Sequence, residues 1–124
     1  MNDRPVRHPD EKHPIAITEC PSTVLVNAGP LDIAKTHAAL TLTEANYGPV
    51  QYVPAADVDM SLLERSDHTT YCPYKGEASY YSIPALGEGG VNAVWTYEAP
   101  FEAVSAIAGH LAFYPDRVSV QLKS

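Results

Sequence analysis

Apolar and polar side chains alternate along most of the chain with the period of two that is typical of β-strands. β-branched and aromatic residues dominate the segments that show this alternation, and prolines or glycines separate them. Connections this short cannot make the crossovers of a parallel sheet, so we predict a mainly β, single compact antiparallel domain of about eight short strands. The predicted strand segments are 15–18, 23–26, 31–34, 39–43, 50–53, 76–83, 91–97, 110–114 and 118–122.

Helical signals are few. The segments 57–63 and 101–107 each predict one short helical turn. Helix also competes with strand over 32–42, but the alternating threonines Thr41 and Thr43 favour strand there.

The stretch 71–81, Tyr-Cys-Pro-Tyr-Lys-Gly-Glu-Ala-Ser-Tyr-Tyr, carries the densest chemistry in the chain. Read as one strand, it has one face of apolar or small side chains and one face of charged or polar side chains. The first face consists of Cys72, Tyr74, Gly76, Ala78 and Tyr80, and the second of Lys75, Glu77, Ser79 and Tyr81.

The glycine-rich segment 84–90 predicts a long hairpin loop after this stretch. If the two ends of that hairpin pair directly, Ser79 lies opposite Trp95, and Glu77 lies opposite Tyr97. A shift of one residue instead places Trp95 in the core, on the face of Ala78 and Tyr80. The sequence fits both registers.

With 124 residues, the chain is long enough for one domain with a core of its own. Residues 1–12 are charged and interrupted by prolines, which predicts a flexible N-terminal arm before a single domain at 13–124. A net charge of -7 and a pI near 5.0 argue against nucleic-acid binding. No apolar run approaches the roughly 18 residues of a membrane span. The first residues also lack a secretory signal, so we expect a cytoplasmic protein.

Metal and cofactor sites are not predicted. Cys20 and Cys72 lie too far apart for a zinc knuckle, and the five histidines show no metal-binding spacing. The chain also has no catalytic Ser-His-Asp order and no dinucleotide-binding glycine fingerprint.

Four blocks of sequence resemble the bacterial family catalogued as domain of unknown function 427. They are Tyr52-Val53-Pro54 with Asp57-Val58, the run from Cys72 to Tyr80, the run from Ala93 to Tyr97 with Pro100, and Ala112-Phe113-Tyr114-Pro115. The resemblance implies a β-tent-like domain or partly open barrel in a small cytoplasmic bacterial protein. The family is also catalogued as nucleotidyltransferase-like, but this chain lacks a glycine-serine phosphate loop followed by paired aspartates.

The leading hypothesis for function is the binding of a small polar or anionic molecule in a groove beside the 71–81 stretch. We expect Lys75, Glu77, Trp95 and Tyr97 to line it, with Lys75 meeting an anionic group and Trp95 stacking on a planar one.

Two other classes of function remain open. A small enzyme could use Cys72 or Lys75 as its nucleophile in the same groove, with His68 or His110 as a base. A structural or interaction module could instead pair its sheet edges or exposed tyrosines with another chain, such as a second copy in a homo-oligomer.

Overall fold

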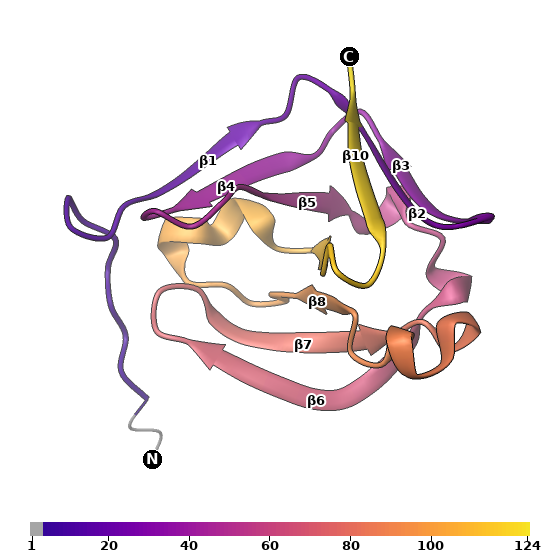
Figure 1. Ribbon diagram of the computed structural model, residues 1–124. Helices are drawn as coiled ribbons and strands as arrows, with labels where there is room; N and C mark the ends of the chain where they lie inside the picture. Colours follow the sequence, from indigo (N-terminus) through magenta and orange to yellow (C-terminus); the bar gives the residue numbers. More distant parts are fainter. Residues whose placement is uncertain (1–3) are drawn as a thin grey trace.

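The computed structural model describes residues 4–124, and in that range ten strands form two antiparallel sheets (Figure 1). The larger sheet has the order β1-β4-β5-β9-β8-β7-β6, and the smaller has the order β10-β2-β3. The strands are β1 (Ile15–Glu19), β2 (Thr23–Ala28), β3 (Leu31–Thr36), β4 (Leu40–Glu44), β5 (Val50–Pro54), β6 (Glu64–Cys72), β7 (Gly76–Ser82), β8 (Val94–Thr96), β9 (His110–Phe113) and β10 (Ser119–Lys123). Four short 3-10 helices join them in this part of the chain: η1 (Ala55–Asp57), η2 (Met60–Leu62), η3 (Pro84–Gly90) and η4 (Glu102–Ile107).

These elements confirm the predicted mainly β, antiparallel class, and in the described chain β6 is the strand that no predicted segment covers. The segment 32–42 forms strand and not helix, as its threonines indicate. The predicted loop 84–90 is the 3-10 helix η3, and β7 and β8 pair across it. The amide of Ile83 donates to the carbonyl of Gly90 at 2.8 Å, which holds the two ends of η3 together.

Two layers of apolar side chains hold the fold together. In the first, Val24 and Val26 of the small sheet pack with Val53 and Val94 of the large sheet. The second lies on the other face of the large sheet, where η4 covers Leu42, Tyr52 and Ala112 with Val104 and Ile107. Both faces of the large sheet are therefore partly covered, and the uncovered part of the second face is where the candidate site lies.

The N-terminal segment runs along the β6–β7 hairpin. Residues 4–12 contain no strand or helix, and the rest of the predicted arm, residues 1–3, lies outside the described residues. The amide of Arg7 donates to the carbonyl of Pro73 at 2.9 Å. The hydroxyl of Tyr71 donates to the carbonyl of Pro5 at 2.6 Å.

Within residues 4–124 there is no helix of the length and apolar character needed to cross a bilayer.

The stretch 71–81 is a hairpin, so its prediction as one continuous strand is wrong. β6 ends at Cys72, β7 begins at Gly76, and these two residues pair across the turn. Pro73 favours the second position of a turn, and the amide of Lys75 closes the turn on the carbonyl of Cys72 at 3.2 Å. Gly76 has a φ of 109°, a backbone conformation that other residues adopt only with strain. Lys75 therefore does not follow the strand alternation that would place it beside Glu77.

Replacing Gly76 should destabilise the fold through the hairpin turn. We expect Gly76→Ala to lower the free energy of unfolding by about 1–3 kcal/mol, because a Cβ disfavours this φ. Urea denaturation measures the change. Gly89→Ala is the matched control, since a Cβ there meets open space and ordinary φ, and it should change stability by less than about 0.5 kcal/mol. Equal losses in the two variants would contradict the role given to Gly76.

Candidate functional site

The pairing of β7 with β8 determines which side chains share a face. Tyr80 lies opposite Trp95, and Ser79 lies opposite Thr96. Of the two registers that the sequence allows, this is the one that turns Trp95 toward the face of Ala78 and Tyr80. That face is not fully packed, because Trp95 is only half-buried.

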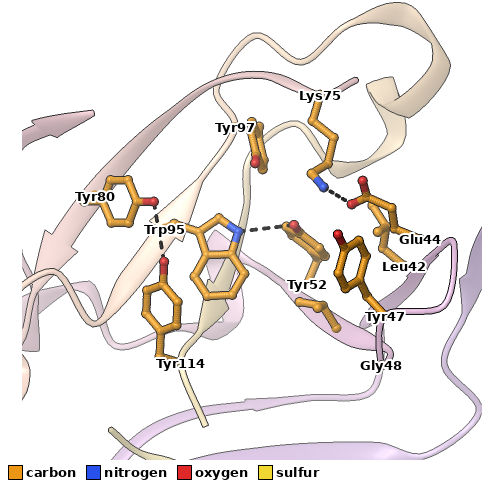
Figure 2. A pocket seen from close by; sticks show the side chains of 11 residues that line it. Leu42, Glu44, Tyr47, Gly48, Tyr52, Lys75, Tyr80, Trp95, Tyr97 and Tyr114 are labelled. Atoms are coloured by element: carbon orange, nitrogen blue, oxygen red, sulfur yellow. Dashed lines mark hydrogen bonds and ion pairs between the residues drawn. The ribbon is translucent and has the colours of Figure 1, made fainter. Parts of the chain in front are cut away.

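A cavity of about 290 Å³ opens on this face. Its lining comes from β4, β5, β7 and β8 and from the turns and loops beside them. Figure 2 shows these side chains around one hollow. The lining residues are Leu42, Glu44, Tyr47, Gly48, Val50, Tyr52, Lys75, Tyr80, Trp95, Tyr97 and Tyr114. Aromatic rings thus form most of the wall, and one cation and one carboxylate lie at one end.

The charged end of the cavity is the pair Lys75 and Glu44. The ammonium group of Lys75 donates to Oε1 of Glu44, and both side chains are largely buried. The other carboxylate oxygen, Oε2, lies 2.7 Å from Nε2 of His13. Burial alone would raise the pKa of Glu44, but the hydrogen bonds from Lys75 and His13 outweigh it and lower the pKa. Glu44 is therefore an anion at neutral pH, and each of its oxygens already accepts a hydrogen bond.

Two tyrosine hydroxyls lie in the floor of the cavity. The indole Nε1 of Trp95 donates to the hydroxyl of Tyr52 at 3.2 Å, and the two rings meet edge to face. Tyr97 is only 6% exposed, and its ring lies under the Lys75 ammonium, 6.0 Å from ring centre to Nζ.

The hydroxyl of Tyr97 has no hydrogen-bond partner among residues 4–124. The Tyr97 oxygen is nevertheless not fully enclosed by protein. In the described chain, the fully buried side-chain polar atom that lacks a hydrogen-bond partner is a different one, Oδ1 of Asn92. The Tyr97 oxygen points into the cavity in Figure 2. A polar group is thus held in a largely buried position with its hydrogen-bonding capacity directed at the cavity.

Burial also keeps these phenols protonated. It raises the pKa of Tyr52 to about 12 and raises the pKa of Tyr97 further in the same direction. Both hydroxyls therefore carry their proton at neutral pH and can donate it in a hydrogen bond.

The opposite end of the cavity is formed by hydroxyls that contact each other. Tyr80 bonds the hydroxyl of Thr70 at 2.9 Å and lies 3.5 Å from the hydroxyl of Tyr114. The Tyr114 ring packs against Trp95, with 4.5 Å between ring centres. Burial and the bond with Tyr80 raise the pKa of Tyr114 to about 12. This end of the cavity is therefore already internally bonded, unlike the Lys75 end.

The structure brings together three of the four residues predicted to bind a ligand and separates the fourth. Lys75, Trp95 and Tyr97 line the cavity, whereas Glu77 lies on the opposite face of β7. The Glu77 carboxylate is about half exposed and bonds Arg4 at 2.9 Å. The expected surface shared by Lys75 and Glu77 is thus wrong, because the turn at Lys75 breaks the strand alternation.

The residues considered for catalysis are spread over the sheet. Cys72 is half-buried at the end of β6, and no hydrogen bond in the described chain joins its thiol to a histidine. The ring of His68, an exposed residue, packs against Tyr80 with 4.6 Å between ring centres. Nδ1 of His110 lies 3.0 Å from the carbonyl of Ala108. Of these candidates, only Lys75 lines the cavity.

Within residues 4–124, no cluster of three or more histidine, cysteine or acidic side chains has the arrangement of a metal site.

Sequence reasoning missed Glu44 and Tyr52 as site residues. Both come from the β4–β5 hairpin, which is distant in sequence from the 71–81 stretch. A signal was present in the composition: the chain has eight tyrosines, and five of them line this cavity within the described residues. Such an excess over phenylalanine indicates that ring hydroxyls are needed, but not where they gather.

Fold and cavity together define a class: a mainly β domain with two antiparallel sheets and an aromatic cavity that contains a buried ion pair. A family model described as Domain of unknown function (DUF427) matches residues 16–124. The chain belongs to this family, which confirms the resemblance seen in the sequence. No curated protein matches the chain.

The ion pair between Lys75 and Glu44 leads to a prediction about the pKa of Glu44. Because its folded-state pKa lies below the ordinary value of 4.5, ionised Glu44 stabilises the fold above that pH. This contribution is lost as the pH falls below 4.5 through the folded-state pKa. We expect Lys75→Met to raise the pKa of Glu44, since burial then acts without the hydrogen bond from the ammonium. An NMR titration of the Glu44 carboxyl carbon measures this change.

His13→Gln provides the comparison, because the hydrogen bond from Lys75 has the larger effect on the pKa of Glu44. The rise should therefore be smaller in this variant. A Glu44 pKa that stays the same in Lys75→Met would contradict the assignment of the pair.

Proposed function

We propose that this protein binds a small planar molecule with a polar or anionic group in the cavity between β4, β5, β7 and β8. The observation that carries the proposal is the buried ammonium of Lys75 beside aromatic rings in a hollow of about 290 Å³. For comparison, an engineered cavity of about 150 Å³ in another protein is large enough to bind benzene.

The aromatic wall supports a ligand with a flat face. Trp95 is half-buried, and its ring lines the cavity between Tyr52 and Tyr114. Aromatic side chains stack favourably on planar groups, and each such contact contributes about 0.5–1.5 kcal/mol beyond simple burial. The rim includes Tyr47, which is 65% exposed and could cover a ligand without a change in the strands.

The Lys75 end supports a polar or anionic group on that ligand. Lys75 is 9% exposed, and burying an ammonium group is costly unless its donors are used. One of its three N–H groups donates to Glu44, which leaves donors for a ligand. Glu77, expected as the acidic partner in the groove, has no part in the proposal, and Glu44 takes its place.

Binding can be tested with the intrinsic fluorescence of Trp95, the single tryptophan of the chain. In a screen of planar polar fragments, we expect members that quench or shift this fluorescence saturably. Lys75→Met should weaken their binding by about 10–100-fold, because a charge-assisted hydrogen bond contributes about 1.5–3 kcal/mol. Isothermal titration calorimetry provides the affinities.

Lys12→Met is the matched control, since it removes the same charge from an exposed position outside the cavity. It should leave the affinities unchanged. If no fragment in a broad library perturbs Trp95, or if both lysine variants bind equally well, the proposed function is wrong.

The proposal retains the expectation of a bacterial protein in the cytoplasm. A function as a structural module or as an enzyme stays a prediction of the sequence, and no contact in the described chain favours either.

A further inference from the structure

The hydrogen-bonding groups in the cavity specify the chemistry of the ligand more closely than the shape of the cavity does. This inference depends on the proposed function, because it assumes that a small molecule occupies the cavity. It concerns three groups at the charged end: the Lys75 ammonium and the hydroxyls of Tyr52 and Tyr97. Figure 2 shows all three directed at the same space beside Trp95.

These three groups have hydrogens left to donate. Lys75 has only donors, and one of its three is used by Glu44. The Tyr52 hydroxyl already accepts a hydrogen bond from Trp95, so its own hydrogen is available. The Tyr97 hydroxyl has no partner in residues 4–124, although 94% of the residue is buried (6% exposed). A carboxylate could use all three donors through its two oxygens and a carbonyl oxygen could use two of them, whereas a group that only donates would leave them unmatched.

Glu44 limits the charge that the ligand can carry. Its two oxygens already accept from Lys75 and His13, so it has no need of a cationic ligand. A ligand cation would also lie beside the Lys75 ammonium, which repels it. A doubly charged anion would in turn lie beside the ionised Glu44 carboxylate, in a largely buried site where repulsion is poorly screened. The charges of the pair nearly cancel, and the cavity is suited to a neutral acceptor or a single negative charge.

We infer that the ligand is a planar molecule bearing a carboxylate or carbonyl oxygen, with at most one negative charge. That group accepts hydrogen bonds from the donors of Lys75, Tyr52 and Tyr97, and the planar part stacks on Trp95. Phosphorylated compounds and organic cations are the ligand classes that the cavity disfavours.

Four probes that share one ring test the class directly: benzoate, benzamide, phenyl phosphate and benzylammonium. Titrations of the full chain at pH 7.5, followed by Trp95 fluorescence and by calorimetry, give their affinities. We expect benzoate and benzamide to bind at least tenfold more tightly than the other two, a difference of about 1.4 kcal/mol. Phenyl phosphate is mostly a dianion at this pH, because the second pKa of such phosphates is near 6.

Two conservative variants test the donors. Tyr97→Phe and Tyr52→Phe each remove one hydroxyl and keep the ring, and each should weaken benzoate binding about tenfold. Tyr74→Phe is the matched control, because Tyr74 lies outside the cavity and stacks on His13. Thermal denaturation of each variant separates a loss of binding from a loss of fold.

The outcomes distinguish this inference from the proposed function. Tighter binding of phenyl phosphate or benzylammonium would overturn the ligand class and leave a ligand-binding cavity in place. The ligand class would also be overturned, and the ligand-binding cavity retained, if all four probes failed while other fragments in the broad screen bound in a Lys75-dependent way. Unchanged benzoate binding in both tyrosine variants would overturn the role of the hydroxyls. Failure of the broad screen as well would overturn the proposed function itself.

Discussion

Contact between Lys75 and Glu44 constrains the shape of the large sheet. Glu44 ends β4, near one edge of the sheet, and Lys75 lies in the turn between β6 and β7 at the other edge. β5, β9 and β8 lie between them, so a flat sheet would hold β4 and β7 about 19 Å apart, given about 4.8 Å between neighbouring strands. The ion pair can form only because the sheet curls strongly, as Figure 1 shows. The curl creates the concave face on which the cavity opens.

Aromatic side chains add contacts across the middle of the same sheet. β5 pairs with β9 at Val53–Leu111 and Pro54–His110. Trp95 reaches from β8 across β9 to Tyr52 on β5. Its ring also lines a second, mainly apolar hollow of about 270 Å³ beside Val50 and Phe113. The tryptophan thus adds a side-chain link between β8 and β5 and at the same time forms a wall of the cavity.

The polar groups of the cavity are costly for stability. A buried ion pair commonly contributes little to the fold, because the loss of hydration offsets the attraction between the charges. The Tyr97 hydroxyl, which faces the cavity, adds no hydrogen bond within residues 4–124 that would offset this cost. Apolar side chains of similar size would fill these positions more favourably. Residues that break local rules of packing in this way are expected at sites of function, which is why the cavity and not the rest of the fold carries our proposals.

The sequence by itself determined the local structure, because alternation, β-branched residues and proline act over a few neighbouring positions. It identified the strands from β1 to β5 closely, the strand character of 32–42, the helical turn at η4, and the family. It also identified Lys75, Trp95 and Tyr97 as candidates, since their side chains are chemically distinctive. Only the tertiary structure decided which of them meet. The turn at Pro73 and Gly76 is local, and treating the segment as one alternating strand conceals it. The register of Tyr80 on Trp95 and the curl that joins Glu44 to Lys75 are long-range geometry, and hydrophobic pattern does not encode a pairing between such distant residues.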